Sequence, residues 1–124
     1  DCAILEEQYI QSEKEYGKSM LLAYKLGDTF QACMEIFFVA MSVAGQGRHA
    51  KALRLNAAAT GFAKANEFSV PEEFEVTFVK ELAHKHIVGT RQKVGELQTM
   101  KYEEKGLTLS LSEAIEYALD VETD

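Results

Sequence analysis

The sequence predicts an all-α domain built from about six short helices joined by tight turns. Helix-forming residues dominate the 124-residue chain, which has a single proline and no run of β-branched residues of strand length. A segment at 47–52 also has a degenerate copy at 7–12, forty positions earlier. Repetition at a few tens of residues is typical of stacked antiparallel helical hairpins. We therefore expect residues 1–124 to form one helical-repeat domain.

Residues 1–26 are expected to form a partial first repeat. Glu7 stands where the later copy has a glycine, and Ser12 replaces its small packing residue. The first helix is therefore predicted to run unbroken from about Ala3 to Leu26. Gly27 then closes this helix, because glycine accepts the left-handed conformation that often follows a helix.

The repeat hairpin is predicted at residues 28–66. Asp28 opens its first helix, with Gln31 at the spacing of a capping box. A Gly-Gln-Gly segment at 45–47 separates this helix from a second one that reaches about Asn66. The first helix is hydrophobic almost all round, which predicts that it is central. The polar residues that interrupt it are Gln31, Glu35 and Ser42. The second helix presents a face of mostly small residues, which allows close packing: Ala50, Leu53, Ala57 and Gly61.

The first of the C-terminal capping helices, which together span 71–121, is predicted to start at Pro71. Proline suits the first helical position, and the two glutamates after it suit the positive end of the helix dipole. Gly89 followed by Thr90 predicts the end of this helix and the start of the next, which Gly106 is expected to end.

The last helix is predicted to start at a capping box formed by Ser110 and Glu113 and to reach about Val121. Apolar stripes on the first and last capping helices are expected to cover the hairpin. The stripes consist of Phe74, Phe78 and Leu82 on the first helix, and of Leu111, Ile115 and Ala118 on the last.

The segment Gly47-x-His49-x-x-Ala52, continued by Asn56 and Ala59, resembles the second helix of a tetratricopeptide repeat. Over residues 26–121, the order of glycine turns, alanine-rich helix and serine-capped final helix resembles the C-terminal helical-repeat region of bacterial transcriptional regulators of the LuxR type. The same region is also appended to some nucleotide cyclases and kinases. The resemblance implies tetratricopeptide-like antiparallel hairpins through which a partner or an effector influences attached domains.

Charge and hydropathy exclude two classes of partner. The formal net charge of −7, without a local cluster of Lys and Arg, opposes direct binding to nucleic acid. The longest apolar stretch, 36–44, is about half as long as a membrane-spanning helix and predicts a buried core helix. Cys2 and Cys33 have no spacing typical of a disulfide framework, which favours a reducing, cytoplasmic location.

The candidates for catalysis or metal binding are few. His84 and His86 are two apart on a helix and point to nearly opposite sides, so they suit the helix end better than a shared metal ion. His49 occupies a packing position, and Cys33 is expected to be a small core residue. Glu35 could be an acid or base, but a hydrogen-bonded contact or a solvated edge is favoured. No phosphate loop, triad or nucleotide fingerprint is present, so we expect no catalytic residue, metal or cofactor.

The best functional candidate is a surface formed by Met34, Phe37, Phe38 and Met41. In a tetratricopeptide-like hairpin these residues would face the concave side, and apolar grooves that contain methionine suit helices or peptides. The alternative is that the C-terminal helices of the chain fill this groove. The residues available for that are Phe74, Phe78, Leu82 and Ile115.

Three hypotheses about function follow. The first is a non-catalytic interaction or effector-sensing module of a cytoplasmic bacterial signalling protein, such as a transcriptional regulator. The second is a free-standing scaffold that forms a homodimer through the face just described. The third is a small helical enzyme or ligand carrier that uses Glu35 in a pocket.

Overall fold

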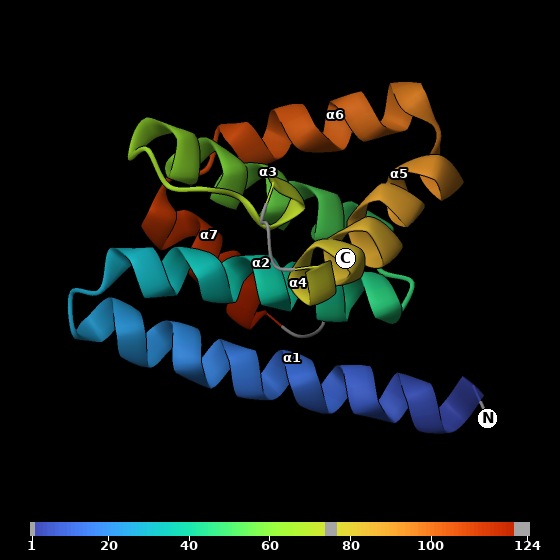
Figure 1. Ribbon diagram of the computed structural model, residues 1–124, viewed down its shortest axis with the longest axis horizontal. Helices are drawn as coiled ribbons and strands as arrows, with labels where there is room; N and C mark the ends of the chain where they lie inside the picture. The colour runs from blue at the N-terminus through green and yellow to red at the C-terminus, as the bar shows by residue number, and fades with distance from the viewer. Residues whose placement is uncertain (1, 74–76, 121–124) are drawn as a thin grey trace.

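The computed structural model describes the backbone of residues 2–73 and 77–120, and these ranges contain helices and turns but no strand (Figure 1). Three long helices come first: α1 (Cys2–Lys25), α2 (Thr29–Gly45) and α3 (His49–Ala65). A single 3-10 turn, η1 (Pro71–Glu73), precedes a rod made of α4 (Thr77–Ala83), the π-helical turn η2 (His84–Val88) and α5 (Gly89–Val94). The described part ends with α6 (Glu96–Leu107) and α7 (Leu111–Leu119). With the rod counted once, the described ranges form six helices, which confirms the all-α prediction.

None of the helices in these ranges combines the length and the apolar character that crossing a membrane requires.

The first three helices are antiparallel to their neighbours along the chain, and α2 lies between α1 and α3 (Figure 1). Gly27 and Gly47 make the two reversals at φ values of 80° and 81°, where other residues are strained. Asp28 caps α2 by accepting a hydrogen bond of 3.0 Å from the backbone N–H of Gln31. These helices start and end within about a residue of the predicted positions, since each turn has a residue that specifies it.

The central position predicted for α2 is confirmed by its burial. Helices α1, α3 and α7 and the turn η2 all pack against it. Its hydrophobic residues are largely removed from solvent, and Glu35 and Ser42 are buried with them. Met20 from α1, Leu55 from α3, Ile87 from η2 and Ile115 from α7 belong to the same core cluster.

The predicted helix break at Gly89 is wrong. Gly89 has helical angles, φ −60° and ψ −40°, and the rod continues through it to Val94. Thr90 is likewise no cap, because its hydroxyl donates to the carbonyl oxygen of His86 inside the rod. The break falls at Gly95, where φ is 92°. A glycine permits a helix end but does not require one, so the sequence pattern selected the wrong glycine.

Gly106 lies in the last turn of α6 and has a different role from the predicted helix end. The helix continues to Leu107 and is capped at Thr108. A Cβ atom at Gly106 would overlap the carbonyl oxygen of Arg54 and come within 2.9 Å of the Cβ of Ala57, both on α3. The glycine therefore lets α6 approach the backbone of α3 closely.

The final helix starts as predicted, because Ser110 and Glu113 form both hydrogen bonds of a capping box. Ala114, Ile115 and Ala118 of α7 are buried against the first three helices, whereas the predicted end at Val121 lies outside the described residues.

The apolar stripe predicted on the first capping helix covers the hairpin only in part. Leu82 packs against the core, but Phe78 is 69% exposed, and Phe74 lies outside the described residues. The helix predicted from Pro71 begins as one 3-10 turn, after which residues 74–76 are not described.

Candidate functional site

The four residues of the predicted concave face lie largely inside this chain. The exposed fraction is 6% for Met34, 1% for Phe37 and 5% for Met41. Phe38 is half-buried, and its ring stacks on Tyr16 of α1 with centroids 5.3 Å apart. The face is thus no open groove: a partner could reach little beyond the edge of Phe38 without separating helices. Binding of a partner at these residues stays a prediction.

Segments that precede α2 in the chain and segments that follow it both cover this face. Helix α1 supplies Tyr16, because α1 is an unbroken helix that packs along α2. From the C-terminal side Leu82 lines the same cleft as Phe38 and Met41, and Ile115 belongs to the core cluster around α2.

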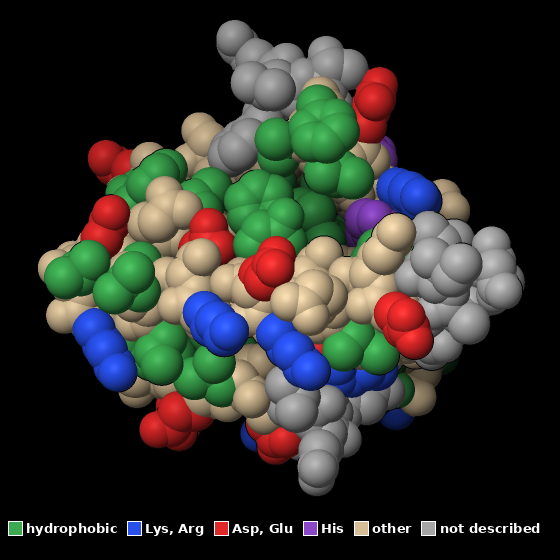
Figure 2. All heavy atoms as spheres, turned by 90° about the horizontal axis from the view of Figure 1, so that it is seen from below, with side chains coloured by type: hydrophobic (Ala, Val, Ile, Leu, Met, Phe, Trp, Pro, Cys, Tyr) green, Lys and Arg blue, Asp and Glu red, His purple; other side chains and the backbone are tan. Residues whose placement is uncertain are grey.

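A cleft of about 160 Å³ remains where α1, α2 and the rod meet, and we call it the aromatic slot. Helix α1 contributes Tyr9, Ser12 and Tyr16, and α2 contributes Phe38, Met41 and Ser42. Leu82 and His86 of the rod complete it. The Ser42 hydroxyl donates to the carbonyl oxygen of Phe38 at 3.0 Å, so it is already engaged. Figure 2 shows hydrophobic side chains gathered next to a histidine and a basic side chain above α1.

A second cleft of about 200 Å³ adjoins the slot and has a different character. It is lined by Ala44 and Gly45 at the end of α2 and by Lys85, Thr90 and Lys93 of the rod. We call it the basic hollow. Tyr9 and His86 line both clefts, and their rings meet edge to face with centroids 5.3 Å apart. This ring pair is therefore the wall that the slot and the hollow share.

Gly45 makes the position of Tyr9 possible. A Cβ atom at residue 45 would overlap the aromatic ring of Tyr9, so the ring lies directly against the glycine backbone. Any larger residue there would displace the ring and change the shared wall.

His86 was expected near a helix end and instead lies in the π-helical turn inside a continuous rod. Its pKa is lowered, first by burial and then by the positive charges of Lys85 and Lys93. The imidazole is consequently neutral at physiological pH and can donate one hydrogen bond and accept another. His84 is exposed and lines neither cleft.

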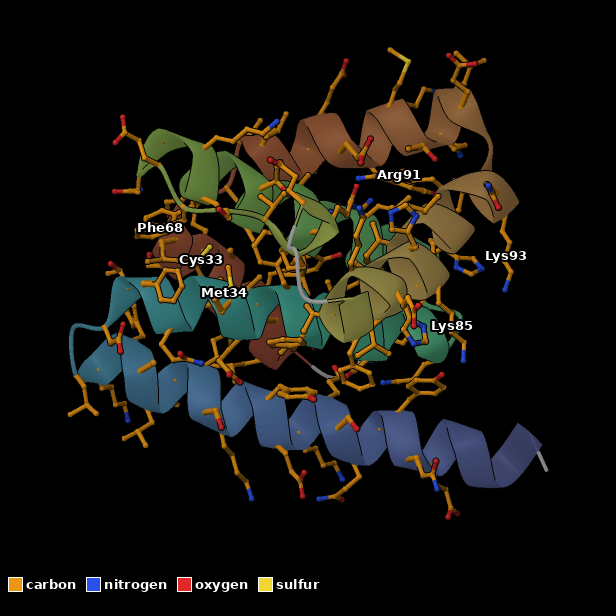
Figure 3. The ribbon with its side chains drawn as sticks, in the orientation of Figure 1. Cys33, Met34, Phe68, Lys85, Arg91 and Lys93 are labelled. Carbon is orange, nitrogen blue, oxygen red and sulfur yellow. The ribbon has the colours of Figure 1, made fainter. Side chains whose placement is uncertain are left out.

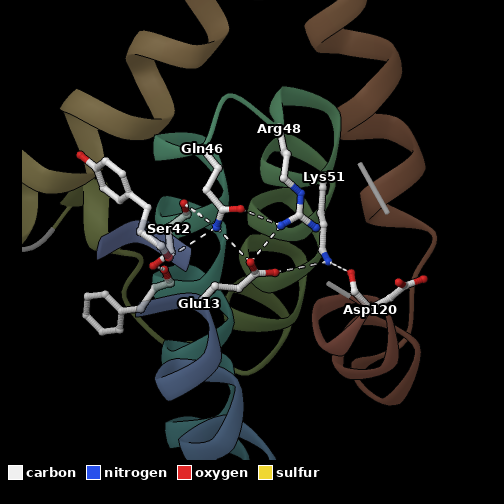
Figure 4. A network of polar contacts seen from close by, with 8 residues as sticks. Glu13, Ser42, Gln46, Arg48, Lys51 and Asp120 are labelled. Carbon is white, nitrogen blue, oxygen red and sulfur yellow. Dashed lines mark hydrogen bonds and ion pairs between the residues drawn. The ribbon is translucent and has the colours of Figure 1, made fainter. Parts of the chain in front are cut away.

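A buried polar network, which the sequence did not reveal, lies at the turn between α2 and α3 (Figure 4). Glu13 of α1 is 3% exposed, and its Oε1 accepts hydrogen bonds of 2.9 Å from both Gln46 and Arg48. Its Oε2 lies 3.7 Å from the Nζ of Lys51, a lysine that is 0% exposed. Lys51 also donates to the backbone carbonyl of Asp120 at the end of α7. The network thus ties α1 to the hairpin turn and to the end of α7.

The sequence carried one signal for this network. Glu13 falls in step with Tyr9, Gly17 and Met20, which lie three or four residues apart and so share one helix face. A carboxylate on an apolar stripe needs a cationic partner, but nothing in the sequence identified Arg48 and Lys51, both of which resemble surface residues. The structure shows that they are brought in by the reversal at Gly47.

The other residues considered for catalysis or metal binding lie in packing or hydrogen-bonded positions outside both clefts. The Oε1 of Glu35 accepts 2.8 Å from the Gln31 side chain; burial raises the Glu35 pKa, and Glu35 lines neither cleft. Cys33 points from α2 toward α3 (Figure 3), and burial raises its pKa to about 12, so it is an inert thiol at neutral pH. His49 begins α3 and is half-buried. Within the ranges that the structure describes, no three His, Cys, Asp or Glu side chains could hold a metal ion.

Comparison of the chain with protein-family models, with curated protein sequences and with solved structures finds no match in any of the three.

Proposed function

We propose that this domain is a non-catalytic, tetratricopeptide-like module of a bacterial signalling protein, such as a LuxR-type transcriptional regulator. In this proposal it binds a protein partner and senses an effector. The motif at 47–59 and the order of the helices support it, since an antiparallel hairpin occupies residues 29–65, where the resemblance expects one. Such hairpins commonly offer contact surfaces.

The observation that carries the proposal is an apolar stripe on α6. Leu97 is 76% exposed, Met100 52% and Leu107 60%, and we call these three residues the α6 stripe. At 100° per residue they fall within about 80° of one another around the helix axis. Exposed large apolar side chains on one helix face, here interrupted by the exposed Glu104, are a feature of surfaces that bind other proteins. Of the residues on α6, only Thr99 and Gly106 are buried.

The α6 stripe is mechanically connected to the rest of the domain. Gly106 lets α6 lie directly on the backbone of α3 at Arg54. Lys51 lies near the start of α3, and Arg48 directly precedes its first residue. A partner that shifts α6 therefore acts on the helix that the buried network ties to α1 and α7. This rigid connection suits a module that transmits binding to attached domains.

Photo-crosslinking tests the proposal. A photoreactive amino acid placed at Met100 in the native cell should crosslink to one identifiable signalling or transcription protein, and Leu97→Asp should strongly reduce that product. The matched control is the same amino acid at Lys18, an exposed position on α1. The same products from Lys18, or none from Met100, would contradict the proposal.

The second candidate function is self-association as a scaffold, and the α6 stripe favours this too, because two stripes can pair with each other. It no longer depends on Phe37, which is buried. In the experiment above, self-association predicts a crosslinked dimer of the chain itself, with dimerisation in sedimentation experiments that Leu97→Asp abolishes.

A further inference from the structure

We propose that the aromatic slot and the basic hollow together bind a small aromatic carboxylate, with the ring in the slot and the carboxylate in the hollow. This inference rests on the proposed effector-sensing function and identifies the chemical class of the effector. Its basis is the contrast between two adjoining clefts that share Tyr9 and His86.

The slot suits a single aromatic ring. Its volume of about 160 Å³ is close to that of a cavity of about 150 Å³ that binds benzene in another protein. Tyr16 and Phe38 present stacked rings, with 24° between their planes, and Met41 and Leu82 add polarizable and aliphatic surface. Aromatic rings pack well against such surroundings in edge-to-face or offset arrangements.

The basic hollow supplies the positive charge. Lys85 and Lys93 are exposed and form no ion pair with any other residue in the part of the chain that the structure describes. Both extend to the same side of the rod (Figure 3). Because both line the same cleft, a single bound anion lies within reach of two positive charges. They attract a carboxylate, because charge-assisted hydrogen bonds are among the stronger polar contacts.

The π-helical turn explains how these two lysines come together. In a regular α-helix, residues eight apart are offset by about 80° around the axis. A π turn contains more residues per turn, so η2 reduces the offset between Lys85 and Lys93. Single π turns are frequent at functional sites.

The shared wall joins the two halves of the site. Neutral His86 can donate a hydrogen bond to a carboxylate that passes it, and Tyr9 is held in place by Gly45. The ring and the carboxylate lie on different sides of this wall, so the ligand needs a short flexible chain between them. An arylalkanoic acid such as 3-phenylpropionate has this form.

Titration of the whole chain with 3-phenylpropionate, followed by calorimetry and by NMR, tests the inference. We expect shift changes at Tyr9, Tyr16, Phe38 and His86. The neutral analogue 3-phenylpropan-1-ol should bind more weakly, and propionate, which lacks the ring, should not bind measurably.

Two variants divide the site into its parts. Lys85→Gln with Lys93→Gln should weaken 3-phenylpropionate binding roughly tenfold and leave binding of the alcohol unchanged, since only the carboxylate loses partners. Ser12→Leu fills the slot from α1 and should abolish binding of both compounds, while thermal unfolding shows that the fold persists. Lys64→Gln with Lys101→Gln, two exposed lysines outside both clefts, is the matched control.

No binding at millimolar concentration would overturn the inference, as would equal affinity in the Lys85/Lys93 variant or binding that survives Ser12→Leu. The proposed interaction function is tested separately by crosslinking from α6. A protein that fails to bind the acid but crosslinks from Met100 refutes only the ligand assignment, whereas loss of the crosslink alone refutes the proposed function.

Discussion

At the scale of single residues, the feature that most constrains this chain is a buried lysine. Lys51 is 0% exposed, and burial is the main reason why its pKa falls to about 8; the charge of Arg48 lowers it further, while Glu13 and Asp120 oppose the shift. The ion pair with Glu13 keeps the lysine charged at neutral pH at a cost in desolvation. This arrangement fixes how α1 lies against the turn between α2 and α3, since another register would leave a buried charge without a partner.

Lys51 predicts an unusual dependence of stability on pH. Between about pH 8 and the ordinary lysine pKa of about 10.5, the unfolded chain binds more protons than the folded chain, so Lys51 makes the free energy of unfolding rise with pH. The unfolding free energy of the wild type minus that of Lys51→Met should therefore increase by about 1–3 kcal/mol from pH 8 to 10. Urea denaturation at several pH values measures it. Lys101→Met, at an exposed position, should show no such trend, and a flat difference for Lys51→Met would refute the interpretation.

At the scale of helices, the glycines divide into those that end helices and those that let helices approach. Gly27, Gly47 and Gly95 have φ values between 80° and 92° and make turns. Gly45 and Gly106 lie in helices and give space to Tyr9 and to the backbone of α3. Gly89 is required for neither role, because a Cβ atom there would lie 3.9 Å from the carbonyl oxygen of His84, an ordinary contact distance.

The two candidate helix breaks can be compared by matched substitutions. Gly95→Ala should reduce the free energy of unfolding by about 1–3 kcal/mol, because alanine is strained at the φ of 92° that this position adopts. Gly89→Ala should be neutral or stabilise by up to about 1 kcal/mol, because alanine favours a helix. Denaturant titration of both variants gives the comparison. The opposite order would restore a helix end at Gly89.

The close contact of α6 with α3 is testable in the same way. Gly106→Ala should destabilise by about 1–3 kcal/mol, since its methyl group would meet the Arg54 backbone, which cannot move aside cheaply. Gly17→Ala is the control: its methyl group would lie 3.5 Å from the Leu119 side chain, an ordinary contact, so the greater helix propensity of alanine should prevail. Similar effects of the two substitutions on thermal unfolding would mean that α6 does not lie on α3 as described.

At the scale of the whole molecule, many apolar residues pack in a core around α2, while several large ones, including those of the α6 stripe, stay exposed. The face expected to bind a partner is in the core, and the helix that closes the far side of α3 carries exposed Leu97 and Met100. This division moves the proposed contact surface from the hairpin to the outside of the domain.

A comparison of two phenylalanines tests this division. Phe37→Ala should cost about 3–5 kcal/mol of folding free energy, because Phe37 is 1% exposed and its removal leaves a cavity. Phe78→Ala should change stability by less than about 0.5 kcal/mol, because Phe78 is 69% exposed. Chemical denaturation measures both. A mild effect of Phe37→Ala would indicate that the predicted face is open after all.

The parts of the fold that could be predicted are those that neighbouring residues decide. The Asp28 cap, the turns at Gly27 and Gly47, and the Ser110–Glu113 capping box each depend on backbone groups within a few residues, so the first three helices and the start of α7 were located correctly. Gly89 and Gly95 look equivalent at that range, and only packing of the rod against α2 and α3 distinguishes them.

Of the candidate site, the sequence indicated His86 but neither cleft. Both clefts need Tyr9 of α1 beside residues of the rod more than seventy positions later, and the Lys85–Lys93 pair needs a π turn that no local pattern specified. The buried network likewise needs Glu13 to meet residues of the hairpin turn and the end of α7.

The sequence by itself determined that this protein is all-α, that α2 is its central helix, and where the hairpin turns, because local caps and hydrophobic periodicity act over a few residues. Only the tertiary structure decided which apolar residues remain on the surface, which charges are buried together and where clefts lie. These properties depend on which helices meet, and long-range packing between distant segments settles that after the local rules have been satisfied.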